Sequence, residues 1–202
     1  RIQVRLVKGA YWDFEIKHAQ ALGLAYYPVF TRKAHTDVSY LAAAARLFAA
    51  SGRLYPQFAT HNAHSVAAIL EMAGDKEAFE FQRLHGMGEA LHRIVLNGEK
   101  TKCRIYAPVG AHRDLLAYLV RRLLENGANS SFVNRIADPA VSIDDLIADP
   151  AEVVKAMPHP GARHDQIALP ADNGDTFTLR PQDLHQCFRD EEDTWYFPRI
   201  AG

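Results

Sequence analysis

Cysteine is scarce in this 202-residue sequence, which contains only Cys103 and Cys187. The two residues form no Cys-x-x-Cys motif, so the sequence predicts neither a disulfide framework nor a structural zinc site. A reducing, cytoplasmic setting fits this composition best. An excess of charge of one sign is also lacking, because 23 basic residues are balanced by 24 acidic ones and the formal net charge is -1. Nucleic-acid-binding surfaces normally show a clustered basic excess, so we expect no nucleic-acid partner for this segment.

Long apolar runs are missing as well. No stretch of about eighteen apolar residues occurs, and no charged-then-apolar signal segment opens the chain, so we expect no membrane-spanning helix and no secretion signal. The sequence begins with a strand-like run at Arg1 and has no initiator methionine. We therefore expect that the N-terminal part of a domain is missing before this run. Hydrophobic residues make up 48% of the chain, which is enough to bury a core.

Short β-rich runs alternate with longer helical patterns through the first two-thirds of the sequence, which is typical of βα units around a parallel sheet. The strand starts recur roughly every 25 residues, a plausible length for one unit of an α/β barrel. The expected strands are Ile2–Val7, Tyr27–Arg32, Tyr55–Thr60, Phe79–Leu84 and Arg104–Ala107. The expected helices are Asp13–Leu22, Asp37–Ala50, Ala63–Ala73, Gly88–Leu96 and Ala111–Asn126.

The composition of the sequence changes after Asp138-Pro139, where prolines become more frequent and apolar periodicity weakens. We therefore expect residues 1–138 to form the α/β part of the chain. Residues 139–202 are interpreted as a linker or loosely packed extension.

The residues that follow the predicted strands are polar and unusual, and in a parallel α/β barrel these positions form the site. Arg5, Lys8, Arg32 and Lys33 offer cationic donors for phosphate oxygens, and Gly9 permits close backbone approach. Flat apolar surface for a ring system is offered by the pair Tyr11-Trp12. A flavin dinucleotide combines both demands. For any single cationic residue the alternative is a solvated charge on the barrel rim.

A second constellation is the pair Arg121 and Arg122 in the last predicted helix. Two adjacent guanidinium groups can converge on one small carboxylate if the helix lies across the mouth of a pocket, and each matches a carboxylate bidentately. Glu125 has the spacing to hold one of them in place. An ordinary surface salt-bridge pattern remains an alternative.

Ten histidines raise a metal-site alternative, because several of them fall near strand ends: His61, His64, His85 and His112. Metal-dependent barrel hydrolases use such residues together with a carboxylate. The predicted strand ends carry no aspartate or glutamate, so we expect a cofactor-contact or structural role for these histidines and no metal site.

At these strand ends the sequence resembles the proline dehydrogenase barrel, particularly that of the bacterial bifunctional proline utilization A proteins. The resemblance covers about residues 1–138 and is carried by several long motifs in the right order. These are Val4–Asp13 (VRLVKGAYWD), Tyr27–Lys33 (YPVFTRK), Thr36–Ala42 (TDVSYLA), Tyr55–His64 (YPQFATHNAH), Phe79–Glu89 (FEFQRLHGMGE), Cys103–Gly110 (CRIYAPVG) and Leu115–Asp138 (LLAYLVRRLLENGANSSFVNRIAD).

The resemblance implies a (β/α)8 barrel that binds FAD noncovalently and oxidises L-proline to 1-pyrroline-5-carboxylate, passing hydride to flavin N5 and electrons on to a quinone. It implies catalytic roles for Arg5, Tyr106, Arg121, Arg122 and Glu125. It implies a substrate wall made by Leu6, Tyr11 and Tyr106, with Arg121 and Arg122 paired to the carboxylate of proline. It implies a cofactor cradle made by Arg5, Val7, Lys8, Gly9, Ala10, Trp12, Thr31, Arg32, Lys33, Thr60, His61, Asn62 and Glu125.

The sequence also departs from the family pattern. We can place only about the last five strands of the eight-stranded barrel and the terminal helix, so we expect a fragment whose activity needs the missing strands. A non-catalytic barrel remnant is a third alternative beside the flavoenzyme and the metal-dependent hydrolase. For a longer protein the resemblance further implies bifunctionality, peripheral contact with the inner membrane and a homo-oligomer.

Overall fold

The computed structural model describes residues 1–9, 11–127, 135–136 and 138–172. The strands are β1 (Ile2–Val7), β2 (Leu54–Ala59), β3 (Glu80–Leu84) and β4 (Lys102–Tyr106). The main helices are α1 (Trp12–Ala21), α2 (Lys33–Ala49), α3 (Ala63–Met72), α4 (Glu89–Glu99) and α5 (His112–Gly127). They are followed by α7 (Ile143–Ile147), α8 (Pro150–Lys155) and the short 3-10 helix η1 (Pro170–Asp172).

The chain divides into two compact units. The first contains Arg1–Trp12 and Phe30–His164, and the second contains Asp13–Val29 and Asp165–Gly202. All four strands and the helices α2 to α5 belong to the first unit. In the second unit, the hydroxyl group of Tyr27 accepts a hydrogen bond from Gln20 at 2.9 Å and donates one to the carbonyl of Ala168 at 2.8 Å.

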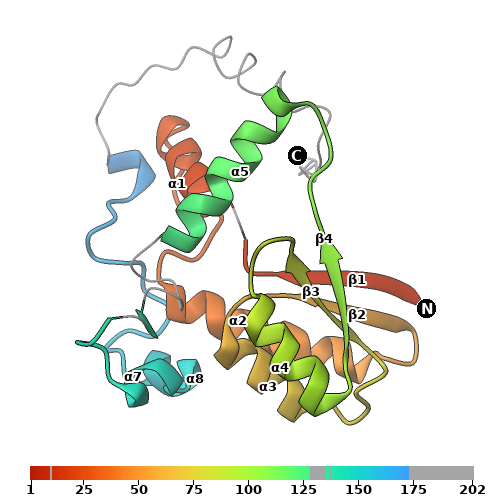
Figure 1. Ribbon diagram of the computed structural model, residues 1–202. Coiled ribbons are helices and arrows are strands. Elements are labelled where there is room, and N and C mark those ends of the chain that lie inside the picture. The colour runs from red at the N-terminus through yellow and green to blue at the C-terminus, as the bar shows by residue number, and fades with distance from the viewer. Residues whose placement is uncertain (10, 128–134, 137, 173–202) are drawn as a thin grey trace. The chain divides into compact units, whose positions relative to one another are not determined.

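The four strands form one parallel sheet in the order β1-β2-β3-β4. Val4 lies opposite Pro56, and Phe58 lies opposite Phe81. Strands that neighbour one another in both sequence and space, each joined to the next through helix, are the arrangement that βα units produce. The predicted α/β class with a parallel sheet is therefore confirmed, and Figure 1 shows the helices α2, α3 and α4 beside this sheet.

One predicted strand, Tyr27–Arg32, is wrong. This stretch contains no strand, and β1 pairs directly with β2 over the whole length of both, so no place remains between them. Its aromatic and β-branched residues resemble a strand, but Pro28 cannot donate a ladder hydrogen bond and α2 begins at Lys33. The described part of the chain therefore holds four strands of the sheet, and the expected five are corrected to four.

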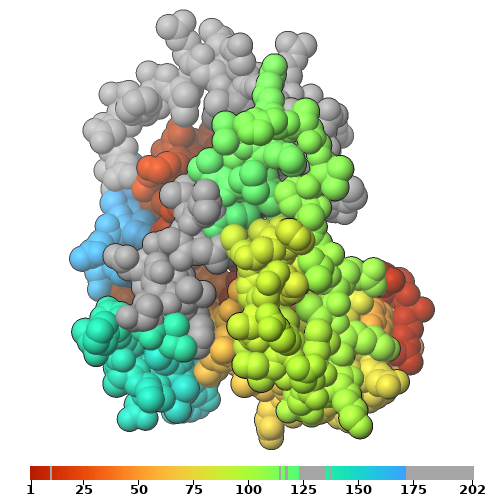
Figure 2. All heavy atoms as spheres, viewed as in Figure 1, coloured from red at the N-terminus to blue at the C-terminus, as the bar shows by residue number. Residues whose placement is uncertain are grey.

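The two faces of the sheet differ in character because alternate side chains of a strand point to opposite sides. One face is apolar and packs on the helices, where Phe58, Phe81, Val66 and Ile69 are almost fully buried together with Phe79. The rings of Phe58 and Phe79 meet edge to face with their centroids 5.6 Å apart. This apolar layer holds α2 and α3 against the sheet. In the space-filling view, the yellow-green atoms of α4 lie at the surface of the molecule that faces the viewer (Figure 2).

Part of the region after residue 138 belongs to the first unit. Helix α8 packs against α2, and its first residue, Pro150, is buried. The side chain of Asp149 caps α8 by accepting a hydrogen bond from the backbone N–H of Ala151, and Ser142 caps α7 in the same way. None of the helices in the described ranges combines the length and the apolar character needed to cross a membrane.

Candidate functional site

The carboxyl ends of the four parallel strands meet at one edge of the sheet, which places the residues that follow them close together. Lys8 follows β1, and Thr60, His61 and Asn62 follow β2. His85 follows β3, and its backbone N–H donates to the carbonyl of Tyr106 at the end of β4 at 2.8 Å. The predicted gathering of polar residues at the strand ends is therefore present for these four strands.

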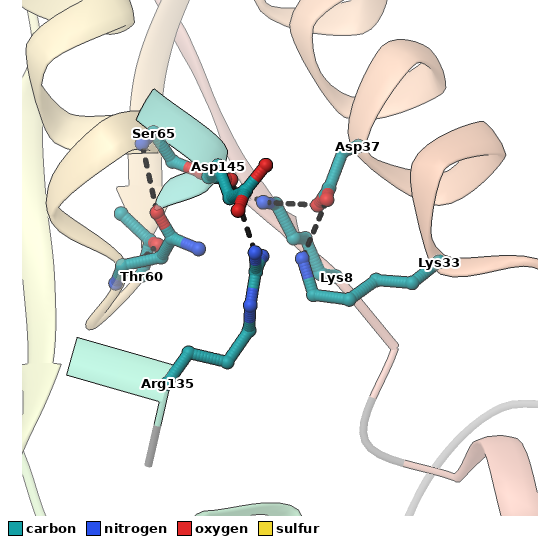
Figure 3. Close-up of polar contacts among 8 residues, drawn as sticks. Lys8, Lys33, Asp37, Thr60, Ser65, Arg135 and Asp145 are labelled. Atoms are coloured by element: carbon teal, nitrogen blue, oxygen red, sulfur yellow. Dashed lines mark hydrogen bonds and ion pairs between the residues drawn. The ribbon is translucent and has the colours of Figure 1, made fainter. Parts of the chain in front are cut away.

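A cluster of charges lies beside the end of β1. The ammonium group of Lys8 donates to Asp37 Oδ1 at 2.6 Å and to Ser65 Oγ at 2.7 Å, and Lys33 donates to Asp37 Oδ2 at 2.6 Å. Figure 3 shows the two lysine side chains meeting at the one carboxylate. Lys8 also lies over the ring of Tyr40, 5.1 Å from its centroid. We call Lys8, Lys33, Asp37 and Ser65 the lysine cluster.

Burial and pairing set the charges of this cluster. The side chains of Lys8 and Asp37 are only 20% and 16% exposed. Burial lowers the pKa of Lys8, and the neighbouring Asp37 carboxylate opposes that shift. For Asp37, burial alone would raise the pKa, but the two lysines outweigh it and the net pKa lies below its ordinary value. Two ammonium groups thus share one carboxylate, which leaves a net positive charge at the strand end.

The first turn of α3 is built by the residues after β2. Asn62 is the N-cap, and its side-chain oxygen accepts a hydrogen bond from the backbone N–H of Ser65 at 3.1 Å. Thr60 Oγ1 in turn accepts from the backbone N–H of Asn62 at 3.1 Å. The helix N-terminus carries partial positive charge, so it adds to the field of the lysine cluster. Both features favour an anionic ligand such as phosphate.

Two histidine rings, one of them directly before the N-cap of α3, pack against each other. The rings of His61 and His92 meet edge to face with centroids 6.5 Å apart. Burial is the main cause that lowers the pKa of His61 to about 4, and the nearby His92, Arg83 and Arg122 lower it further. The pKa of His92 is also lowered by burial. Both rings are therefore neutral at physiological pH.

The polar face of the sheet carries a connected network. Glu80 is its centre, with a side chain only 6% exposed, and it accepts hydrogen bonds from Arg104 at 2.7 and 3.0 Å. Gln57 and Gln82 each donate to Glu80 Oε1 at 2.9 Å. The Arg104 hydrogen bond is the main cause that lowers the pKa of Glu80. Gln82 Oε1 accepts from Arg5 Nε at 2.9 Å, which fixes the guanidinium group of Arg5 above β3.

Three of the predicted site arginines have their guanidinium groups over an aromatic ring. The guanidinium carbon of Arg5 lies 4.6 Å from the ring centroid of Tyr106. On α5, Arg121 lies 4.8 Å from the centroid of Tyr11, and Arg122 lies 5.3 Å from that of Tyr118. A flat guanidinium over an aromatic face is held in one orientation. The structure thus brings together Arg121 and Tyr11, two residues that the family resemblance assigns to the substrate. The side chain of Glu125 lies outside the described residues.

Residues 162–164 contact the turn that precedes α2. Arg32 Nε donates to the carbonyls of Ala162 at 3.3 Å and Arg163 at 3.1 Å. Thr31 Oγ1 accepts from the backbone N–H of His164 at 2.8 Å. This contact could not be predicted from the sequence, because its partners are about 130 residues apart along the chain. Trp12 Nε1 donates to the carbonyl of Phe30 at 2.8 Å at the start of the same turn.

Besides Glu125, two further predicted site residues lie elsewhere or cannot be placed. Leu6 packs against the hydrophobic core cluster, and Ala10 lies outside the described residues. Sequence reasoning missed four residues with clear roles in the geometry: Asp37, Ser65, Gln82 and His92. Two of them had a local signal, because Asp37 is four residues after Lys33 on α2 and Ser65 is three residues after the N-cap Asn62. Across the described residues, no three His, Cys, Asp or Glu side chains are grouped to hold a metal ion.

The family model described as proline dehydrogenase matches residues 1–135. The chain is 66% identical over 177 residues to the bifunctional protein PutA of Rhizobium meliloti and 57% identical over 184 residues to that of Salmonella typhimurium. These matches cover 85% of this chain in both cases. The chain spans 14% of the length of each of these two relatives.

The fold is similar to a crystal structure of proline utilization A from Bradyrhizobium japonicum. The TM-score is 0.79 at 57% sequence identity, and the match covers 87% of this chain and 18% of that one. Likeness of sequence and of fold therefore point to the same group of proteins.

Proposed function

Because the chain belongs to the proline dehydrogenase family, we propose that it supplies one side of a flavin site at which L-proline is oxidised to 1-pyrroline-5-carboxylate. The observation that carries the proposal is the lysine cluster beside the N-terminus of α3, where two ammonium groups held by Asp37 produce a net positive charge. Such a place suits the phosphates of a flavin dinucleotide.

The residues around the cluster fit FAD in kind. Lys8 and Lys33 would hold the pyrophosphate, together with the backbone of Val7, Gly9 and Ala10. A side-chain carbon built on Gly9 would meet no described atom within 4 Å, so the backbone there has room for a ligand at close approach. Trp12 would border the flavin, and the rest of the cradle would be formed by Thr31, Arg32, Thr60, His61, Asn62 and Glu125.

Bound FAD would supply the acceptor for the hydride that leaves the ring carbon beside the nitrogen of proline as the C=N bond forms and the N–H proton departs. Arg5, fixed by Gln82 and Tyr106, would hold a positive charge near flavin N5 and favour the reduced cofactor. Tyr11 and Tyr106 would wall the substrate and exclude water.

Arg121 and Arg122 would bind the carboxylate of proline, with Glu125 supporting them. From the family resemblance alone we also propose that a quinone takes the electrons onward. The same resemblance supports a homo-oligomeric, bifunctional protein that is cytoplasmic with peripheral contact at the inner membrane.

The test uses the full-length protein that contains this chain, assayed for FAD content and for proline oxidation with an artificial electron acceptor. Arg122→Ala should raise KM for proline about tenfold to a hundredfold while FAD content is kept, because a charge-assisted hydrogen bond is lost. Arg5→Ala should lower kcat. Arg113→Ala, an exposed arginine on the same helix as Arg122, is the matched control and should change neither constant. A full-length protein that binds no flavin would sink the proposal.

A further inference from the structure

The carboxylate of Glu80 is the point at which the side chains on the polar face of the sheet converge. Arg104 binds it as a fork, with Nε 2.7 Å from Oε1 and Nη2 3.0 Å from Oε2. The Arg104 hydrogen bond is the main cause that lowers the pKa of Glu80, so this side chain is ionised at neutral pH. An ionised carboxylate accepts hydrogen bonds and has no proton to donate.

The charge of Glu80 fixes the orientation of the Gln82 amide. The NH2 group of Gln82 donates to Glu80 Oε1 at 2.9 Å, and its side-chain oxygen accepts from Nε of Arg5 at 2.9 Å. Turning this amide over would set its oxygen against the carboxylate and its NH2 group against an arginine donor, so both hydrogen bonds would be lost. Only one orientation of the buried amide therefore satisfies both neighbours.

The strand register brings these side chains together. Arg5, Gln57 and Glu80 lie in one row across β1, β2 and β3. Gln82 is two residues after Glu80 on β3, so both side chains point to the same face of the sheet. A guanidinium group is planar, so the bond at Nε, together with the ring of Tyr106 4.6 Å away, restricts where the two Nη groups of Arg5 can point.

We propose that Glu80 is a positioning residue for the oxidation of proline, which acts through Gln82 to hold the guanidinium group of Arg5 in its working orientation. The inference rests on the proposed function, because the place of Arg5 near flavin N5 belongs to that proposal. It deepens the proposal by assigning a residue of the polar face that acts at a distance from the reacting atoms. Arg104 supports Glu80 in this role by keeping it ionised.

Two buried glutamines provide matched variants for the full-length holoenzyme. Gln57 and Gln82 each donate to Glu80 Oε1 at 2.9 Å, and of the two it is Gln82 that accepts from Arg5 in the described part of the chain. Gln82→Met should therefore lower the anaerobic rate of flavin reduction by proline about tenfold, with KM for proline within about twofold of the parent. Gln57→Met loses a bond to the same carboxylate and should keep the rate within about twofold.

A double-mutant cycle tests whether Glu80 acts through Arg5. Glu80→Gln removes the charge that orients Gln82 and should also lower the rate about tenfold. Added to Arg5→Ala, the same substitution should cause no further loss, because two residues that act through one guanidinium group are not additive. Glu99→Gln, which removes a carboxylate paired with Lys76, is the control and should leave the rate unchanged.

Equal losses in Gln57→Met and Gln82→Met would overturn the inference, and so would a loss from Glu80→Gln that is the same with and without Arg5. Either result would assign the network to stability alone and leave the proposed function intact. A parent protein that binds no flavin would instead overturn the proposed function. If Glu80→Gln does not fold, Gln82→Met takes its place in the cycle with Arg5→Ala, and the same outcomes decide.

Discussion

At the scale of single residues, the site depends on charges that are partly removed from water and compensate one another. Asp37 is bonded to Lys8 and Lys33 on its two oxygens, and its side chain is only 16% exposed. A carboxylate in this position stabilises the fold and holds both ammonium groups in one place. Without it, two positive charges would remain close together in a half-buried pocket.

Asp37→Asn should therefore destabilise the protein by about 1–3 kcal/mol at neutral pH, because a buried ion pair loses one partner. The folded-state pKa of Asp37 is lowered from its ordinary value of 3.8, so its contribution is present above that value and disappears as the pH falls through the lowered pKa. Urea unfolding as a function of pH measures the difference between variant and parent. Glu71→Gln, an exposed position on α3, should show no such loss; a constant difference down to pH 3 would contradict the explanation.

Residue identity predicted much of the site but not its partners. In the sequence, predicted site residues follow or precede regular elements, and the structure brings four of them to one edge of the sheet: Lys8, Lys33, Thr60 and Asn62. Which carboxylate would join the lysines could not be read from sequence, since Lys8 and Asp37 are 29 residues apart. The roles assigned through the family resemblance stay predictions.

At the scale of elements, periodicity predicted well wherever burial is one-sided. The helices α1 to α5 and the strands β1 to β4 lie within a few residues of their predicted bounds. The helices α2 to α4 and the four strands each contribute apolar side chains to the core cluster or pack against it. The wrong strand, Tyr27–Arg32, shows the limit of this reasoning. A short run of aromatic and β-branched residues looks the same in a strand and in an extended turn, and only the direct pairing of β1 with β2 excludes the strand.

The start of α3 offers a test at this scale. Asn62→Ala removes the acceptor for the backbone N–H of Ser65 and should lower the free energy of unfolding by about 1 kcal/mol, whereas Asn62→Asp should preserve most of it. Thermal and urea unfolding of the flavin-free protein measure the effect apart from cofactor binding. Asn97→Ala in the exposed interior of α4 is the control, and it should not destabilise because alanine favours helix. Equal losses at both positions would show that the cap contributes nothing.

At the scale of the whole molecule, the two faces of the four-stranded sheet differ in polarity and in how they are covered, and its two edges are unpaired in the described chain. Its apolar face is covered by α2 and α3, but its other face carries Arg5, Gln57, Glu80 and Arg104. The outer edges are β1 and β4 in the described chain, and Ile2 and Ile105 on these strands are 70% and 52% exposed. Parallel sheets are normally covered on both faces, and in a barrel further strands close both edges.

We therefore expect the site to be complete only in a longer polypeptide of the same protein. A chain extended before Arg1 by the strands that close the barrel should retain FAD through gel filtration and unfold in one cooperative transition, because its polar face is enclosed and its edges are paired. The 202-residue chain alone should release FAD and bind a dye for exposed apolar surface. A polypeptide extended by a similar length only beyond Gly202 is the matched control and should behave like the 202-residue chain, since it leaves the edge of β1 unpaired. Stoichiometric FAD on the 202-residue chain would show that these four strands already form a sufficient cradle, and the enclosing strands would then be needed only for the substrate.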